Sequence, residues 1–155
     1  MDEVKINIED SIQFPTDLQS SSRVNEMSVE EKQCLENGFA YINDFTPNVN
    51  PKTKPSKIPR IFHQTFNNRC VNPPIAEAVK AWRTTLKDDD FTFKYYDDDT
   101  VNAALHDKKW KTVFPSLNVV ARCLDMVNNP TMKGDLWRYL QLWETGGLYA
   151  DIDNG

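Results

Sequence analysis

The chain has 155 residues, a net charge of −5 at pH 7 and a hydrophobic content of 39%, which suits one domain of ordinary size with a packed core. The negative charge and the lack of any basic run argue against a nucleic acid as partner. No stretch is apolar and long enough to span a membrane, and the residues after Met1 do not have the pattern of a signal peptide.

Residues 1–56 are predicted to form a polar N-terminal arm. Ser28 followed by Glu31 makes a capping box, which predicts a short helix over 29–37 that ends at Gly38. A linker follows, predicted from three prolines, Pro47, Pro51 and Pro55. The compact domain is therefore expected to cover residues 57–155.

Three cysteines lie far apart in the sequence, at Cys34, Cys70 and Cys123. This spacing fits neither a metal knuckle nor a dense disulfide framework. Buried or free thiols are the favoured interpretation, because free cysteine is usually a small core residue. A single disulfide in an oxidising compartment stays open.

Strands and helices alternate from residue 57 onwards. Runs of β-forming and alternating aromatic residues predict strands, and apolar residues at helical spacing predict helices. The predicted elements are strands at 58–66 and 91–96, a helix at 75–86, and two short helices across 101–127 that are broken at Pro115. This order is typical of an α/β fold with a mostly parallel sheet.

The segment 133–155 carries the most informative pattern. It begins with a predicted helix whose apolar residues form one stripe, consisting of Met132, Leu136, Tyr139, Leu140 and Trp143. Asp135 and Arg138 lie three residues apart at the edge of that stripe. The glycine pair at 146–147 ends the helix. A strand at 148–153 follows, in which every second side chain, from Tyr149 to Asp151 and Asp153, faces the same way.

Asp151 and Asp153 place two carboxylates side by side at a strand end. Two such groups repel each other unless a cation compensates them, and a hard divalent cation takes oxygen ligands. Because their Cα atoms are about 7 Å apart on a strand, we expect Asp153 to be a direct metal ligand and Asp151 to act through water or a substrate hydroxyl. A solvated acidic turn is the alternative, since D-x-D alone is a weak signal.

The candidate residues follow the predicted strands at their carboxyl ends. Phe66 ends the first strand, the triplet Asp97-Asp98-Asp99 follows the second, and Asp151 lies at the end of the last. Ligands of open α/β sheets bind beyond the carboxyl ends of strands, so these residues are expected around one site. The triplet is assigned to capping the next helix, because aspartate is a preferred N-cap.

The stretch D-L-W-R-Y-L-Q-L-W-E-T-G-G-L-Y-A-D-I-D at 135–153 resembles the DXD region of glycosyltransferase family 32, which includes fungal α-1,6-mannosyltransferases and α-1,4-galactosyltransferases. The run I-P-R-I-F-H-Q-T-F at 58–66 is similar to the opening motif of that family, with phenylalanine where the family more often has tryptophan. The resemblance covers roughly 57–155 and implies a GT-A nucleotide-sugar-binding domain with a Rossmann-like, mostly parallel sheet.

The resemblance also implies roles for individual residues. Phe66 would stack on the nucleotide base, Asp151 would hold the ribose or a metal-bound water, and Asp153 would bind Mn²⁺ or Mg²⁺, with Mn²⁺ the more usual metal in the family. Asp135 and Arg138 would contact hydroxyls of the donor sugar, and the alternative for this pair is a surface ion pair. No side chain is assigned as a catalytic acid, base or nucleophile.

By the same resemblance, the chain would transfer a hexose from a UDP- or GDP-sugar to a hydroxyl of a glycan, lipid or protein, with retention of anomeric configuration. Family members continue well beyond the DXD motif, so we expect the chain to be the N-terminal part of a longer domain and to be inactive by itself. Many eukaryotic relatives work in the Golgi lumen behind an N-terminal anchor, and no such anchor is visible in this sequence.

Three alternatives stay open. A phosphatase-like D-x-D would use Asp151 as nucleophile, although that motif normally follows the first strand of its domain. A calcium loop that begins at Asp151 would need glycine at its sixth position, whereas Gly155 stands at the fifth. The third alternative is an inactive domain that binds a nucleotide sugar or only folds.

Overall fold

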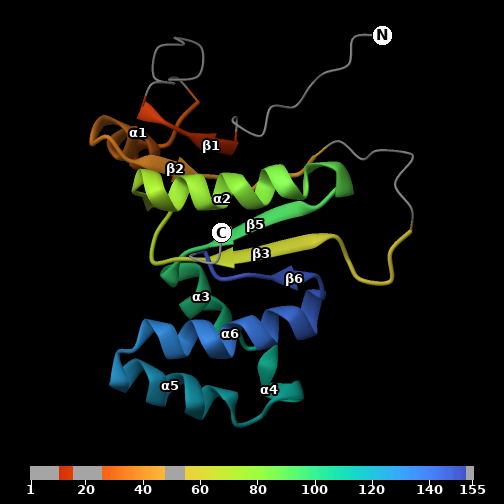
Figure 1. Cartoon of the computed structure of the whole chain (residues 1–155). Helices are drawn as coiled ribbons and strands as arrows, with labels where there is room; N and C mark the ends of the chain where they lie inside the picture. Colours follow the sequence, from red (N-terminus) through yellow and green to blue (C-terminus); the bar gives the residue numbers. More distant parts are fainter. Residues whose placement is uncertain (1–10, 16–25, 48–54, 153–155) are drawn as a thin grey trace.

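The structure is a computed structural model that describes residues 11–15, 26–47 and 55–152. Its main sheet has β3 (Ile61–Thr65) between β5 (Thr92–Tyr96) and β6 (Leu148–Tyr149), as Figure 1 shows. Both pairings are parallel, and Phe62 lies opposite Phe93 on one side and Leu148 on the other. The three strands therefore end at the same edge of the sheet, which confirms the predicted α/β fold.

A second, antiparallel sheet is built mainly from the N-terminal region. It consists of β1 (Ile12–Gln13), β2 (Ala40–Ile42) and β4 (Cys70–Val71). The capping box predicted at Ser28 is present, since Ser28 Oγ accepts the Glu31 N–H at the start of α1 (Val29–Glu36). The described N-terminal residues thus pack against later parts of the chain, because β2 pairs with β4 and Ile12, Ala40 and Ile42 share one core cluster with Val71 and Val79. The division of the chain at residue 57 stays a prediction.

Two contacts join the N-terminal region to later parts of the chain, one to β4 and one to β5 of the main sheet. A disulfide links Cys34 to Cys70, so the favoured interpretation of these two cysteines as thiols is wrong, whereas Cys123 is an exposed thiol. Phe45 forms an antiparallel bridge with Phe93, which covers part of the outer edge of β5. The sequence did not determine the disulfide because the two cysteines meet only through the pairing of β2 with β4.

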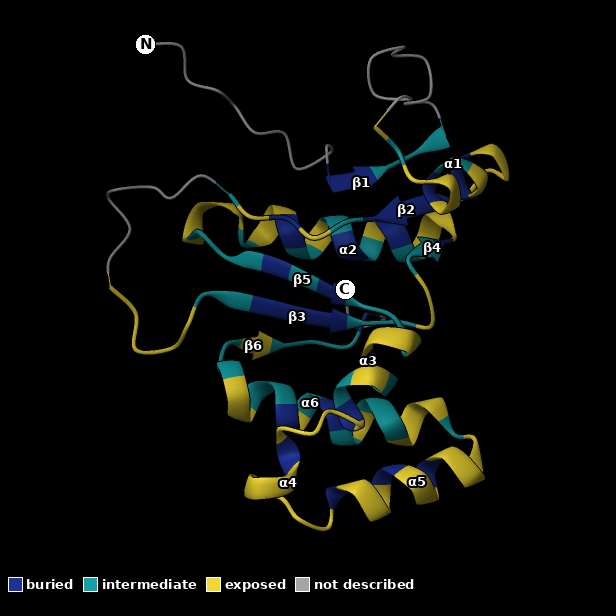
Figure 2. Cartoon of the chain, turned by 180° about the vertical axis from the view of Figure 1, so that it is seen from behind, coloured by how far each residue is buried: buried dark blue, intermediate teal, exposed yellow. Residues whose placement is uncertain are grey.

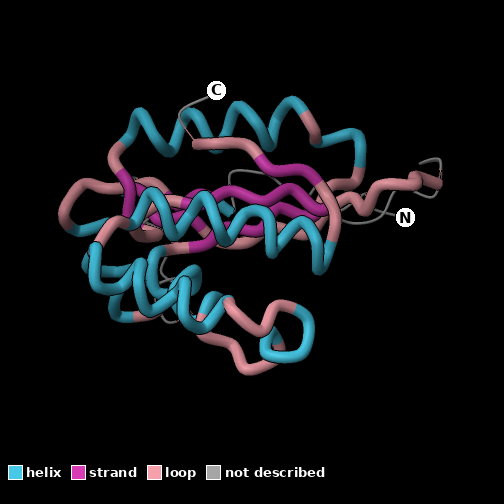
Figure 3. Tube along the Cα trace, turned by 90° about the horizontal axis from the view of Figure 1, so that it is seen from below, coloured by secondary structure: helices cyan, strands magenta, loops and turns pink. Residues whose placement is uncertain are grey.

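Helices pack on both sides of the main sheet (Figure 3). They are α2 (Pro73–Thr85), the short 3₁₀ helix η3 (Lys87–Asp89), α3 (Asp98–Leu105), α4 (Trp110–Val113), α5 (Leu117–Val127) and α6 (Pro130–Thr145). The two helices predicted across 101–127 are three in the structure. The break at Pro115 is correct, and a second break after Leu105 lets the Trp110 indole donate to Ala104 O at 2.8 Å. No described helix is long and apolar enough to cross a membrane.

The buried face of α6 differs from the predicted stripe. Trp137 is 1% exposed and Leu140 7% exposed, whereas Tyr139 and Trp143 are 72% and 60% exposed. Trp137 packs in the cluster that α6 shares with α3 and α5, about 100° around the helix from the stripe. Two residues of the predicted stripe do face the core, since Leu140 is buried and Leu136 packs against the same cluster. Because α6 carries apolar side chains over most of its circumference, periodicity alone did not identify the burial of Trp137.

The strand predicted over 148–153 is shorter than expected. Only Leu148–Tyr149 pairs with β3, and Leu148 is 39% exposed because β6 is an edge strand. The chain then leaves the sheet, yet Ile152 is buried in the cluster formed by β2, β4 and α2. Asp153 lies outside the described residues.

Candidate functional site

A cavity of about 630 Å³ opens at the carboxyl ends of the parallel strands. One wall comes from the residues that follow β3, β5 and β6, and the other comes from the first half of α6. Its lining residues include Phe66, Asn67, Asp98, Gly134, Asp135, Arg138, Tyr149 and Asp151. The volume lies within the range of about 300–1,000 Å³ that small-molecule sites occupy.

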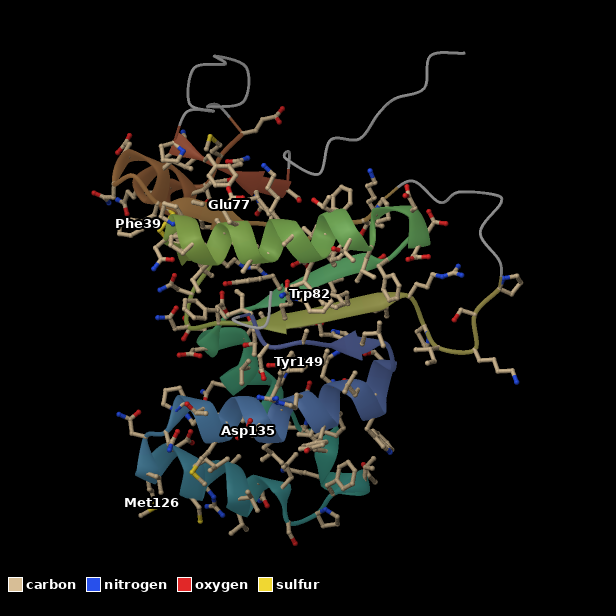
Figure 4. The ribbon with its side chains drawn as sticks, in the orientation of Figure 1. Phe39, Glu77, Trp82, Met126, Asp135 and Tyr149 are labelled. Atoms are coloured by element: carbon tan, nitrogen blue, oxygen red, sulfur yellow. A yellow bond between two sulfur atoms is a disulfide. The ribbon has the colours of Figure 1, made fainter. Side chains whose placement is uncertain are left out.

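The structure brings together the candidate residues that it describes. Phe66, Asp135, Arg138 and Asp151 all line this cavity, although they come from three separate parts of the chain. Figure 4 shows Asp135 on α6 and Tyr149 on the neighbouring β6. Phe66 is partly buried against the core, and its N–H donates to Tyr96 O at 3.1 Å. The roles assigned to these residues, and the position of Asp153, stay predictions.

Arg138 forms two ion pairs across the cavity wall. Its Nη2 lies 2.7 Å from Asp135 Oδ1 on the same helix and 3.2 Å from Asp151 Oδ1 beyond β6. The side chains of Asp135 and Asp151 are 56% and 41% exposed, so the two pairs contribute little to stability. The arrangement instead fixes a guanidinium and two carboxylates within reach of one ligand.

Tyr149 supports this arrangement from the strand. Its hydroxyl donates to Asp151 Oδ1 at 2.9 Å, and the Arg138 guanidinium carbon lies 4.5 Å from the centre of its ring, a cation–π contact. Burial and the hydrogen bond to Asp151 raise the pKa of Tyr149. Sequence reasoning placed Tyr149 and Asp151 on one face of a strand but assigned no role to the tyrosine.

A tight turn sets the position of β6. Gly146 ends α6, with its N–H bound to Leu142 O at 2.9 Å, and both Gly146 and Gly147 have positive φ. At Gly147 a Cβ atom would collide with the carbonyl oxygen of Ile61 on β3 and lie 3.1 Å from His63 Nε2. Only glycine lets the chain pass this close to the central strand and enter the cavity wall.

His63 holds the same turn from the centre of the sheet. It is 1% exposed, its Nε2 lies 3.0 Å from Gly146 O and its Nδ1 lies 3.1 Å from the Tyr96 hydroxyl. Nε2 therefore carries the proton in the neutral ring, since a carbonyl only accepts. Burial lowers the pKa of His63, although the hydrogen bond to Gly146 opposes this effect. His63 is therefore a hydrogen-bonded core histidine.

The acidic triplet after β5 caps α3 as predicted. Asp97 Oδ1 accepts the Thr100 N–H at 2.8 Å. Burial raises the pKa of Asp97, but the hydrogen bonds from Thr100 and the nearby Arg69 outweigh it, so the pKa is lowered overall. Asp98 behaves differently, because burial and its acidic neighbours raise its pKa. Asp98 also lines the cavity, as its place after a strand end led us to expect.

The residues around Asp151 provide part of a site for a hard cation. Asp151 Oδ1 is occupied by Arg138 and Tyr149, and Oδ2 has no hydrogen bond or ion pair with a described residue. A carboxylate oxygen is the ligand type that Mn²⁺ and Mg²⁺ prefer. Within the described part of the chain there is no group of three or more His, Cys, Asp or Glu residues that could hold a metal ion. The donor chemistry therefore fits a metal that takes one oxygen from Asp151.

Comparisons with known proteins point to one family. A family model described as "Glycosyltransferase sugar-binding region containing DXD motif" matches residues 75–155. No curated protein and no solved structure matches the chain. The match runs from α2 through the cavity wall and the acid pair, and the parallel sheet is consistent with part of a GT-A-like nucleotide-sugar-binding domain. Because the matched region spans more than half of its residues, the chain belongs to the family of glycosyltransferase sugar-binding regions that contain a DXD motif.

Proposed function

We propose that the chain binds a nucleoside-diphosphate hexose, in a domain that transfers the hexose to a hydroxyl acceptor. The observation that carries this proposal is the pair of contacts from Arg138 to Asp135 and Asp151 at the wall of one cavity. It joins the residues with the predicted donor-sugar role to the first acid of the DXD motif. If Asp135 and Arg138 formed only a surface ion pair, there would be no reason for both to line a cavity or for Arg138 also to contact Asp151.

The cavity lining suggests an order for the parts of the donor. Phe66 offers an aromatic face for the base at the end of β3, and Asp151, which lines the same cavity, offers an acceptor for ribose hydroxyls. Asp135 and Arg138, on the α6 wall of the cavity, offer an acceptor and a donor for hydroxyls of the hexose. Hydrogen bonds to charged groups are the stronger kind, so this pair supplies orientation for the sugar.

We further propose that a divalent cation, Mn²⁺ or Mg²⁺, is held by Asp153 and Asp151. DXD glycosyltransferase domains generally bind a divalent metal, and the free Asp151 Oδ2 suits one. When bound, such an ion neutralises negative charge that develops on the leaving diphosphate. The Tyr149 hydroxyl and Arg138 meanwhile fix Oδ1, so the carboxylate presents its other oxygen in one orientation.

The reaction proposed here exchanges one C–O bond for another. The bond between the anomeric carbon and the diphosphate breaks, the diphosphate leaves with the electron pair, and the acceptor oxygen bonds to the anomeric carbon as its hydroxyl proton is released. Placement in glycosyltransferase family 32, retention of configuration and the choice between UDP- and GDP-sugars belong to this proposal through the sequence resemblance alone.

Binding measurements on matched arginine variants test the donor site. Arg138→Met should weaken binding of UDP-glucose or GDP-mannose, in the presence of Mn²⁺, by more than it weakens binding of UDP or GDP, because the sugar contacts are lost in addition to the ion pair with Asp151. Arg122→Met removes an arginine from α5, outside the cavity, and should leave both affinities unchanged. Equal affinities of wild type and Arg138→Met for the nucleotide sugar would remove the donor-sugar role of Arg138.

A further inference from the structure

The helices α4, α5 and α6 expose many large apolar side chains on the side of the molecule away from the antiparallel sheet, and five of these side chains line one groove. Figure 2 shows α4 and most of α5 as exposed. Most of the large exposed apolar side chains of the described residues belong to this part of the chain, and we call them the helical apolar face: Val113, Phe114, Val119, Val120, Met126, Val127, Met132, Tyr139 and Trp143. Scattered exposed apolar residues are normal in proteins, but a contiguous group marks an interaction surface.

A groove runs through this face between α5 and α6. It has a volume of about 670 Å³ and is lined almost entirely by apolar residues, including Phe114 and Val120 on one side and Tyr139 and Trp143 on the other. Trp143 and Tyr139 are amphipathic aromatics, the residue types that accumulate where an apolar phase meets water. The composition of the groove is therefore typical of a protein surface that lies at an interface between water and an apolar phase.

The charged groups of these helices that form no ion pair with a described residue are positive. The acids of these helices are engaged in ion pairs, such as Glu144 with Lys109 at 2.6 Å and Asp125 with Lys133 at 2.5 Å. Within residues 105–145, three cations form no ion pair with a described residue: Lys108, Lys111 and Arg122. Arg122 is one turn from Met126 on α5, and Lys111 lines a small hollow together with Phe114. The chain as a whole is acidic, at −5, so a local excess of free cations selects an anionic partner.

The donor cavity does not compete with this face for space. On α6, Asp135 and Arg138 project toward the strands, whereas Leu136, Tyr139 and Trp143 line the groove on another side of the same helix. A flat partner could cover the groove and leave the cavity open. A second copy of the chain is disfavoured, since a symmetric contact would bring the same unpaired cations together.

We propose that the helical apolar face docks on the surface of an anionic lipid bilayer, with Trp143 and Tyr139 entering the headgroup region and the three cations contacting lipid phosphates and carboxylates. Binding of this kind adds the burial of an apolar face to attraction between lysine or arginine and anionic lipids. It needs no membrane-spanning segment and is independent of the function proposed for the cavity.

Vesicle sedimentation tests the proposal. The wild-type chain should sediment with vesicles of phosphatidylcholine and phosphatidylserine in equal parts, and markedly less with phosphatidylcholine alone. Tyr139→Ser combined with Trp143→Ser should raise the lipid concentration for half-binding at least about tenfold, because two large apolar contacts are lost. Lys111→Gln combined with Arg122→Gln should abolish the preference for the anionic vesicles. Phe39→Ser is the control, because Phe39 is an exposed aromatic at the opposite end of the molecule from Met126, as Figure 4 shows.

Trp143 contacts Trp110 and Phe114, so the double variant must be checked by thermal melting. If it melts well below the wild type, Tyr139→Asp decides the question, since Tyr139 is 72% exposed and its replacement leaves those contacts in place. The proposal is overturned if the wild type sediments with neither kind of vesicle, or if Tyr139→Asp binds as the wild type does. It is also overturned if light scattering shows a wild-type dimer that Tyr139→Asp dissociates, because a second copy then covers the face.

Discussion

The turn at 146–147 requires glycine for two reasons, the positive φ of its backbone and the lack of space for a Cβ atom at Gly147. Substituting alanine for single glycines of the chain separates the free-energy costs of these two requirements. Gly38 has φ +81 and open space where a Cβ atom would lie, Gly134 lies in α6 with open space, and Gly147 has φ +98 with the Ile61 carbonyl oxygen against it. Gly38→Ala should cost about 1 kcal/mol for the left-handed backbone alone. Gly134→Ala should add about 0.8–1 kcal/mol of stability, because alanine is the better helix former.

Gly147→Ala carries the backbone cost and a steric cost together. The colliding atom belongs to the backbone of β3, which cannot move without disturbing its pairing with β6. We expect a loss of about 3 kcal/mol, at the upper end of ordinary substitutions, which lowers the melting temperature of a chain of this size by roughly 6–12 °C. Thermal melts followed by circular dichroism provide the measurement. If Gly147→Ala melts at the same temperature as Gly38→Ala, the close approach of the turn to β3 contributes nothing and the reasoning is refuted.

Three further predictions concern His63, the Cys34–Cys70 disulfide and Tyr149. The folded-state pKa of His63 is lowered by burial, so the stability it contributes is complete above its ordinary pKa of 6.5 and is lost as pH falls below that value; urea unfolding at a series of pH values should show this slope. Replacing both Cys34 and Cys70 by serine should cost about 3–4 kcal/mol, for a sequence separation of 36, measured by the same unfolding method. Tyr149→Phe should weaken nucleotide binding roughly 2- to 10-fold through the lost hydrogen bond to Asp151, with an unchanged melting temperature.

Each of these predictions has a control within the chain. His63→Gln should remove the pH-dependent part of the slope, and a slope identical to the wild type would assign it to other groups. Cys123→Ser changes an exposed free thiol and should leave stability unchanged with or without reductant. If Tyr149→Phe bound the nucleotide as tightly as the wild type, then Arg138 alone would suffice to orient Asp151.

The sequence predicted which residues meet at the cavity more accurately than it predicted which helix faces are buried. Phe66 and Asp151 could be placed at one edge because the order of elements forces a parallel sheet, whose strand ends coincide. On α6, the inward positions of Leu136 and Leu140 were predicted, but the burial of Trp137 could not be, because Trp137 and Trp143 are equally apolar and only the positions of α3 and α5 decide which one is buried.

The N-terminal region was predicted less well, for a related reason. Strand β1 has two residues and β2 has three, too few for an alternating pattern to be recognised. They form strands because they pair with each other and with β4, and β4 lies far along the sequence. The hydrogen bond from Tyr149 to Asp151 could have been predicted from the sequence, since both residues were assigned to one face of a strand. The role of the tyrosine became clear only from the geometry of that hydrogen bond.

Titration calorimetry with a nucleoside diphosphate tests the account most directly. The wild-type chain should bind UDP or GDP in the presence of Mn²⁺ and bind it much more weakly after chelation of the metal. Asp151→Asn should lose the metal-dependent part of the affinity, because the amide removes the charge of the only described DXD acid. Asp99→Asn is the matched control, since Asp99 follows the same kind of strand end but does not line the cavity, and it should bind as the wild type does. Equal, metal-independent binding by the wild type and Asp151→Asn would contradict a nucleotide-sugar site built around the acid pair.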